Sequence, residues 1–347
     1  MKTAVIILNW NTKDYLRAFL PALLHACRGE DACVVVADNG SDDGSVNMLS
    51  AEFPEVKVIA LGNNYGYTGG YNRAIAAMEK EGPLPDYLVL LNSDIMVDDA
   101  WLGPLTAWMD SHPECGICGP KLHALDPDGK GGWIKTSRFE YAGAAGGLMD
   151  CIGLPYCRGR VLRKVEDDTG QYDGGPCDVL WVTGSCLMIR SSLWDALDGL
   201  DGRFFAHQEE IDLCWRAQLS GFRVTVLPQS CVWHLGGGTL PQGSPLKLKL
   251  NFRNNLMLLE KNLPLTLEAR GLSPVTAHKK TVRLLRLRLF MHKCAKILYL
   301  CSGKREYARA VDDAHSEWRE LREQAYQMPE TAPDARVEGL GNKCIIL

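Results

Sequence analysis

The first hundred residues alternate short apolar runs with segments of helical periodicity, and this alternation restricts the chain to few folds. We expect strands at residues 4–8, 33–37, 56–61 and 87–91, and helices at residues 14–24, 45–52 and 73–81 between them. The apolar runs are nearly continuous, as is typical of strands covered on both faces. The pattern therefore predicts an α/β fold with a mostly parallel central sheet flanked by helices.

Polar residues follow each of these strands. The segments are Asn9-Trp10-Asn11, Asp38-Asn39-Gly40-Ser41, Gly62-Asn63-Asn64 and Asn92-Ser93-Asp94. Open sheets of this kind bind ligands beyond the carboxyl ends of their strands. We therefore expect Asn9, Asp38, Asn63 and Asn92 to belong to a ligand site.

Two carboxylates at these strand ends suit particular chemistry. Asp94 can hold a divalent cation, because Mg²⁺ and Mn²⁺ take hard oxygen ligands and share them with phosphate groups. Asp38 can accept hydrogen bonds from a ribose or a base edge. The simpler interpretations are that Asp94 is a turn residue and that the loop after Asp38 caps the next helix.

The glycine-rich run from Gly62 to Arg73 opens the third predicted helix. Glycines such as Gly69 permit close backbone approach, and free N–H groups at a helix start attract phosphate. Asn72 lies in the same run. The run is neither a Walker loop nor a well-formed GxGxxG, which argues against a dehydrogenase or a kinase-like ATPase.

An acidic run later in the chain reads Phe204-Phe205-Ala206-His207-Gln208-Glu209-Glu210-Ile211-Asp212, and His234 follows it. Like charges this close raise one another's pKa, which suits a general base or a metal-linked acid. Apolar residues repeat at helical spacing behind the run, so the carboxylates also fit a helix N-terminus. The run by itself leaves both interpretations open.

The remaining segments are less regular. Residues 119–176 are glycine-rich, and their aromatic residues indicate loops that pack on the rest of the protein. Apolar runs typical of strands return at residues 179–183 and 223–227. Residues 282–300 mix large apolar residues with lysine and arginine. Such a basic helix can lie on an anionic membrane surface or pack on the main domain. The segment after Tyr326 is expected to be loose.

Composition narrows the classes of function and location. The net charge of −4 gives no reason to expect nucleic acid as a partner. The first apolar run is too short for a signal peptide, and no stretch approaches the length of a membrane span. We expect a cytoplasmic protein, and residues 279–305 are the segment through which it would contact the inner membrane face if the basic helix lies on a membrane.

Thirteen scattered cysteines are expected to be reduced thiols. The spacing of Cys115-Gly116-Ile117-Cys118 is a weak signal for a metal or redox site. The last four residues, Cys344-Ile345-Ile346-Leu347, match a prenylation pattern of little specificity.

In its motifs the chain resembles the family 2 glycosyltransferases of GT-A fold, in the rhamnosyltransferase-like branch. The matching segments are residues 5–11, 36–45, 64–72, 90–94, 184–190, 204–216, 234 and 251–255. Each segment is loose alone, but the set in this order is specific. The resemblance implies a Rossmann-like catalytic domain over residues 1–265, with a nucleotide-binding half to about 118 and an acceptor half over 119–265. A basic helical extension over 266–326 and a loose tail over 327–347 would follow.

The resemblance also implies roles for individual residues. It implies a nucleotide-diphosphate sugar donor, Mg²⁺ or Mn²⁺, and an inverting single displacement. Asp38 would contact the base or ribose, and Asp94 matches the last acid of the family's metal motif, whose first position is Asn92 here. His234 matches a further metal ligand. Arg253 matches an arginine that helps to hold the diphosphate or the acceptor.

Glu210 falls where the family has its catalytic base, often an aspartate. Glutamate places the carboxylate one methylene further out and can do the same chemistry. Glu209 and Asp212 would support it. The implied acceptor is a glycan or a lipid-linked sugar of cell-surface polysaccharide synthesis, and dTDP-rhamnose is the donor that the branch suggests.

Two alternative functions stay open at this point. A sugar nucleotidyltransferase shares strand-end carboxylates and a metal, but Asn9-Trp10-Asn11-Thr12 offers no basic phosphate-binding cluster. A catalytically inactive sugar-nucleotide-binding module would keep the same binding residues, and slow hydrolysis of a donor would argue against it.

Overall fold

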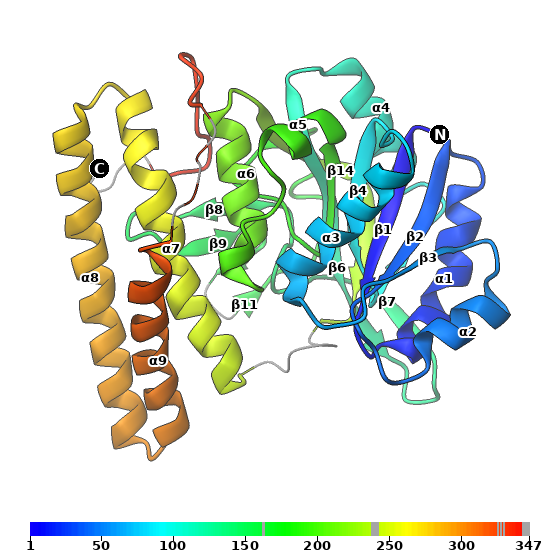
Figure 1. The fold of residues 1–347 in the computed structure, drawn as a ribbon, viewed down its shortest axis with the longest axis horizontal. Coiled ribbons are helices and arrows are strands. Elements are labelled where there is room, and N and C mark those ends of the chain that lie inside the picture. The colour runs from blue at the N-terminus through cyan, green and yellow to red at the C-terminus, as the bar shows by residue number, and fades with distance from the viewer. Residues whose placement is uncertain (162–163, 237–242, 325, 327, 329, 342–347) are drawn as a thin grey trace.

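A ten-stranded mixed sheet forms the centre of the computed structural model, which describes residues 1–161, 164–236, 243–324, 326, 328 and 330–341 (Figure 1). The strands of this sheet are β1 (Thr3–Asn9), β2 (Ala32–Asp38), β3 (Lys57–Ala60), β4 (Tyr87–Asn92), β5 (Ile95–Val97), β6 (Cys115–Pro127), β7 (Trp133–Phe139), β12 (Cys177–Asp178), β13 (Cys186–Arg190) and β14 (Arg223–His234). Two small hairpins, β8 (Gly147–Met149) with β9 (Pro155–Cys157) and β10 (Arg160–Val161) with β11 (Lys164–Val165), lie outside it.

The strand order explains why polar residues from distant parts of the chain meet. The path is β12-β14-β6-β13-β4-β1-β2-β3, and β4, β1, β2 and β3 are mutually parallel. β13 is antiparallel to both β4 and β6, while β14 is parallel to β6. The ends of β1, β2, β4 and β14 and the start of β13 therefore share one edge, called the carboxyl edge below.

Helices cover both faces of the sheet, as the alternating pattern predicts. One apolar core packs α1 (Lys13–Cys27), α2 (Ser45–Glu52) and α4 (Leu102–Ser111) on the sheet, through residues such as Leu16, Leu49 and Leu105. The other packs α3 (Gly66–Glu81), α5 (Ser191–Ala196) and α6 (Glu209–Leu219) on the opposite face, through residues such as Ile75 and Trp215. The predicted α/β architecture is confirmed.

Three long helices complete the chain: α7 (Pro245–Ala269), α8 (Pro274–Cys301) and α9 (Arg305–Leu321). They lie side by side at one end of the molecule, next to α6 (Figure 1). α7 runs unbroken across residue 265, where we expect the catalytic domain to end. None of the described helices is long and apolar enough to cross a membrane.

Part of the C-terminal tail is packed, although we expected the tail to be loose. Val337 and Leu340 are buried, and the backbone N–H of Met149 donates to the carbonyl of Gly339. Hydrophobic contact therefore anchors this stretch to β8. The prenylation match at 344–347 lies outside the described residues.

Several local predictions were wrong. α3 begins at Gly66 rather than at residue 73, because its glycines allow close packing: a Cβ on Gly70 would lie 2.6 Å from Leu8. Residues 179–183 form no named strand, whereas Cys186–Arg190 forms β13. Residues 119–139, expected to be irregular, mostly belong to β6 and β7, and Cys115 and Cys118 are buried in β6.

Candidate active site

A hydrogen-bonded network of short polar side chains lies at the carboxyl edge of β1, β2 and β4. Asn9 donates to Asp38 Oδ2 at 2.7 Å and to Ser41 Oγ at 3.0 Å. Thr12 Oγ1 donates to Asn9 Oδ1 at 2.6 Å and lies 2.8 Å from Ser93 Oγ. Asp38 also accepts from the Ser41 N–H. The network fixes the Asp38 carboxylate and joins the three strand ends.

Asn39 joins the loop after β2 to the start of α3. Its amide nitrogen donates to Asn64 Oδ1 and to the carbonyl of Gly66, and its oxygen accepts from the Tyr65 N–H. Gly40 has a φ of +79°, and a Cβ there would lie 2.7 Å from the Asn63 backbone. Only glycine fits this approach. The backbone of Asn63, whose side chain is exposed, therefore lies against the loop that follows Asp38. A contact of Asn63 with a ligand stays a prediction.

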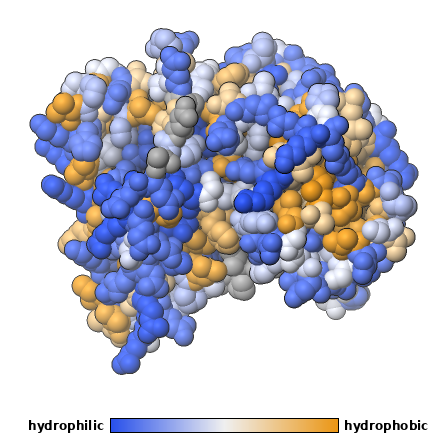
Figure 2. Space-filling view, in the orientation of Figure 1, coloured by the Kyte–Doolittle hydropathy of each residue, from blue (hydrophilic) through white to orange (hydrophobic). Residues whose placement is uncertain are grey.

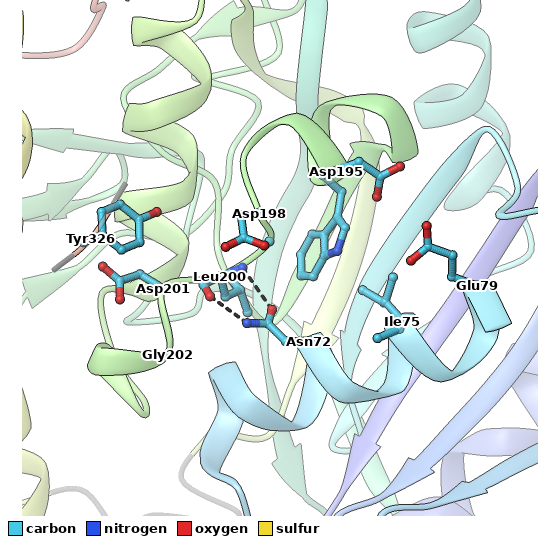
Figure 3. A pocket seen from close by; sticks show the side chains of 12 residues that line it. Asn72, Ile75, Glu79, Asp195, Asp198, Leu200, Asp201, Gly202 and Tyr326 are labelled. Carbon is cyan, nitrogen blue, oxygen red and sulfur yellow. Dashed lines mark hydrogen bonds between the residues drawn. The ribbon is translucent and has the colours of Figure 1, made fainter. Parts of the chain in front are cut away.

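Gly69 and Asn72 lie inside α3 rather than in a loop before it. A Cβ on Gly69 would lie 2.9 Å from Tyr65 Cβ, so this glycine permits tight packing of the first helical turn. Asn72 donates to the Leu200 carbonyl at 2.7 Å and accepts from the Leu200 N–H at 3.0 Å. It lines a separate cavity of about 490 Å³, together with Trp194, Asp201 and Tyr326 (Figure 3). A contact of Asn72 with the donor stays a prediction.

Asp94 and His234 meet at the carboxyl edge although 140 positions separate them. His234 Nε2 lies 3.1 Å from Asp94 Oδ1, and His234 Nδ1 lies 3.8 Å from Glu140 Oε1. All three side chains are less than a tenth exposed. Burial alone would lower the pKa of His234, but the carboxylates of Asp94 and Glu140 outweigh it and raise that pKa to about 10. This position therefore stabilises positive charge.

The Asp94–His234 pair fits a divalent cation. A carboxylate oxygen and an imidazole nitrogen are a normal donor set for such an ion, and they already lie within reach of each other. Among the described residues, no group of three or more His, Cys, Asp or Glu side chains is placed to hold a metal. The protein would thus supply few ligands, and the rest would come from the diphosphate and water.

Glu210 lies in the first turn of α6, next to the start of β13. A Cβ on Gly184 would lie 3.3 Å from Glu210 Cβ and 3.2 Å from the hydroxyl of Tyr67. Tyr67 donates from that hydroxyl to the Gly184 carbonyl. Ser185 follows Gly184 in the chain, and its Oγ lies 3.5 Å from Asn92 Nδ2. Gly184 and Ser185 thus join the Glu210 position to the end of β4.

Glu209 and Glu210 have different environments. Glu209 is buried, and its Oε2 atom has no hydrogen-bond partner. Burial, with the charge of Glu210, raises the pKa of Glu209 well above its usual value. Glu210 is half-buried, and desolvation raises its pKa to about 7. A carboxylate that is partly accessible and titrates near neutrality suits a general base.

The loop before α6 has a strained backbone. Phe205, His207 and Gln208 all have positive φ, at 63°, 70° and 68°, a region that non-glycine residues rarely adopt. Such strain persists only where the surroundings hold it, and it is common at functional sites. The N–H groups of Tyr67 and Thr68 donate to the Phe205 carbonyl from α3. The start of α3 therefore holds this loop from one side.

Helix α7 holds the same loop from the other side. Asn254 Nδ2 lies within 3.1 Å of the carbonyls of Phe204, Ala206 and His207. The buried Arg253 donates to the Phe204 carbonyl at 2.7 Å and to Glu317 at 2.8 Å. The structure therefore gives Arg253 contacts that position the loop, and its contact with a diphosphate or acceptor stays a prediction.

Asp212 lies two residues after the predicted base Glu210 in α6 but faces the interior. It is fully buried and accepts from Arg216 at 2.7 Å, Lys261 at 2.8 Å and Asn262 at 2.9 Å. Burial alone would raise the pKa of Asp212, but Lys261 and Arg216 hold it below its usual value. Its ion pairs fix α6 to α7. A supporting role of Asp212 for the base stays a prediction.

Four residues of the site were given no role from the sequence, although three of them lie in segments that match the family. Glu140 faces His234, Tyr67 and Gly184 pack beside Glu210, and Asn254 binds the strained loop. A polar residue alone carries no signal of such long-range contacts. The three asparagines within Asn251-Phe252-Arg253-Asn254-Asn255 were a weak sequence signal. In the structure two of these three, Asn254 and Asn255, are fully buried, which is unusual for asparagine.

The comparisons with known proteins show a glycosyltransferase with the GT-A fold. Residues 4–163, just under half of the chain, match the family model described as glycosyl transferase family 2. The N-acetylglucosaminyl-diphospho-decaprenol L-rhamnosyltransferase of Mycobacterium tuberculosis is 28% identical over 240 residues, which are 66% of this chain and 75% of that protein. Rhamnosyltransferase WbbL of Escherichia coli is 24% identical over 228 residues, 65% of this chain and 80% of WbbL.

Solved structures agree on the fold. GalNAc-T7, crystallised with UDP, GalNAc and Mn²⁺, superposes with a TM-score of 0.54 at 17% identity, over 86% of this chain and 57% of GalNAc-T7. The mannosyltransferase PcManGT from Pyrobaculum calidifontis, in complex with GDP-Man and Mn²⁺, has a TM-score of 0.50 at 11% identity, over 91% of this chain and 85% of PcManGT.

Proposed function

We propose that the chain transfers a sugar from a nucleotide-diphosphate sugar to an acceptor hydroxyl, with inversion and with Glu210 as the base. The observation that carries this proposal is the position of Glu210. Its half-buried carboxylate titrates near neutrality at the start of a rigidly held helix, next to the edge where β1, β2 and β4 end. We assign catalysis to residues 1–265, with the donor half to about 118.

The donor would bind along the carboxyl edge. The fixed carboxylate of Asp38 would accept hydrogen bonds from the ribose or base, and Asn9 would hold it in place. Asn63, Gly69 and Asn92 would contact the diphosphate and the sugar. Since two relatives are named rhamnosyltransferases, we propose dTDP-rhamnose as the donor.

We propose the acceptor and the place of the reaction from the name of one of these relatives. The name of the mycobacterial relative specifies a diphospho-decaprenol carrier bearing N-acetylglucosamine. We propose a lipid-linked sugar of a cell-surface polysaccharide as the acceptor here. A carrier of this kind is held in a membrane, so the enzyme would act from the cytoplasm at the inner membrane face.

The reaction is a single displacement. Glu210 would take the proton of the acceptor hydroxyl onto its carboxylate while the hydroxyl oxygen forms a bond to the anomeric carbon. The bond from that carbon to the diphosphate oxygen breaks, and the nucleoside diphosphate leaves with its electron pair. Asp94 and His234 would hold Mg²⁺ or Mn²⁺, which when bound neutralises charge that develops on the diphosphate.

Nucleotide binding should depend on the metal through Asp94. Thymidine diphosphate should raise the melting temperature of the wild-type protein by roughly 2–5 °C more with Mn²⁺ than without, because a ligand of the native state stabilises it. Asp94→Asn should lose most of this metal-dependent increment, while Asp99→Asn, an exposed carboxylate on the following turn, should keep it. Differential scanning fluorimetry makes the measurement. An increment that survives in Asp94→Asn would exclude Asp94 as a ligand.

A further inference from the structure

Helix α8 exposes a continuous stripe of basic and apolar side chains. The exposed residues recur three or four positions apart, so they share one face. They are Lys279, Arg283, Arg286, Phe290, Lys293 and Ile297, with Leu298 and Leu300 beside them and Lys304 in the turn that follows the helix. Phe290, Ile297 and Leu298 are 63%, 59% and 70% exposed. Large apolar side chains gathered in this way usually mark an interaction site.

The charge on this helix has one sign. Residues 274–305 contain nine lysines and arginines and no aspartate or glutamate, in a chain whose net charge is −4. Lys296 is paired with Asp312 of α9, but Arg283, Arg286, Lys293 and Lys304 are exposed. The helix therefore presents an anion-attracting surface in a chain whose overall charge is negative.

The apolar part of the stripe lies in the C-terminal part of α8, which ends at the turn to α9. Residues 290–305 are called the hairpin tip below. Tyr307, two residues beyond the tip in α9, donates a hydrogen bond to the carbonyl of Gly243, just before α7. Figure 1 shows the tip on the same side of the molecule as the end of β14. Apolar residues alternate with hydrophilic ones there (Figure 2, lower left).

We propose that the hairpin tip docks on a bilayer containing anionic lipid, with Phe290, Ile297 and Leu298 inserted among the acyl chains and the lysines and arginines at the headgroups. This combination of an apolar stripe with flanking basic residues is the pattern of interfacial helices. A purely electrostatic partner such as nucleic acid would leave the apolar residues unexplained. Docking through the tip places the carboxyl edge of the sheet toward the membrane, where a lipid-linked acceptor resides. This orientation rests on the proposed function, but the docking itself does not.

Flotation with lipid vesicles tests the docking. The full chain should bind vesicles of phosphatidylcholine and phosphatidylglycerol and bind vesicles of phosphatidylcholine alone far less, by about fivefold for each basic side chain at the surface. Binding should weaken as salt is added. Equal binding to both vesicle types, or none to either, would overturn the proposal.

A matched pair of variants locates the contact. Ile297→Ser/Leu298→Ser should lower the vesicle partition coefficient at least roughly tenfold, because two apolar side chains no longer insert. Val275→Ser, which changes a 64% exposed residue at the other end of the same helix, should bind as wild type does. Melting curves of both variants should match the wild-type curve, since neither position is in the core.

Three further readouts separate this proposal from others. Equal losses in both variants would place the contact elsewhere than the tip. If Ile297→Ser/Leu298→Ser abolished a wild-type dimer and left vesicle binding unchanged, the stripe would be a self-association surface and the proposal would be wrong. Sugar transfer to an acceptor without its lipid should be the same in Ile297→Ser/Leu298→Ser as in the wild type. A wild-type protein that binds vesicles but transfers no sugar would contradict the proposed function and leave the docking proposal intact.

Discussion

Glu210→Gln should lower the rate of sugar transfer by roughly 10²–10⁴-fold, the range that a positioned general base contributes. Glutamine keeps the size and the hydrogen-bonding oxygen of the side chain but cannot accept the acceptor's proton. Donor affinity should change little, because the residues proposed for the donor lie at the ends of β1, β2 and β4. Rates of nucleoside diphosphate release with acceptor present, and donor affinity by calorimetry, make the comparison.

The matched control is Glu55→Gln, which removes an exposed carboxylate in the turn before β3 and should leave the rate unchanged. The pH profile gives a second check on the base. Since the pKa of Glu210 is raised to about 7, kcat should fall about tenfold per pH unit below 7 and level off above it. Near-wild-type turnover in Glu210→Gln would refute the assignment of the base.

Asp212→Asn should destabilise the fold by about 3–5 kcal/mol, the usual result of breaking a buried ion pair by removing one partner. Asp212, Arg216 and Lys261 are all buried or nearly so, and Lys261 also contacts Asp201 at 2.9 Å. Without the Asp212 charge, Asp201 is the remaining aspartate beside the two buried cations Lys261 and Arg216. Asparagine would keep the shape but present an amide N–H₂ in a place where three donors already converge.

Urea unfolding at neutral pH measures this loss. The control is Asp126→Asn, whose partner Arg138 is equally exposed, so that the change should cost less than about 1 kcal/mol. A loss in Asp212→Asn no larger than in the control would show that α6 is held by other contacts. Transfer by the surviving folded fraction should also fall, because the helix that carries Glu210 would shift.

The sheet could be predicted because its signals are local. Uninterrupted apolar runs alternating with helices leave little choice but a wound sheet, and parallel strands must end at one edge. The structure accordingly brings Asn9, Asp38 and Asn92 to that edge. The family motifs added the identity of the enzyme class, which strand periodicity alone does not contain.

The predictions that failed depend on contacts distant in sequence. Glycines lower helix propensity, yet α3 starts at Gly66 because Phe205 caps its first N–H groups and Leu8 needs the space at Gly70. The sequence of β13 does not distinguish it from the residues around it as a strand. It becomes a strand because β4 and β6 pair with it on both sides. Likewise, the interior contacts of Arg253 and Asn72 cannot be seen from a motif.

The configuration of the product's new linkage tests the central claim most directly. Proton NMR of a reaction with dTDP-rhamnose, Mn²⁺ and a synthetic lipid-linked N-acetylglucosamine acceptor reports the anomeric configuration of donor and product. A single displacement with Glu210 as base predicts a product of configuration opposite to the donor. A product that retains the donor's configuration, or release of free sugar in place of a linked product, would contradict it.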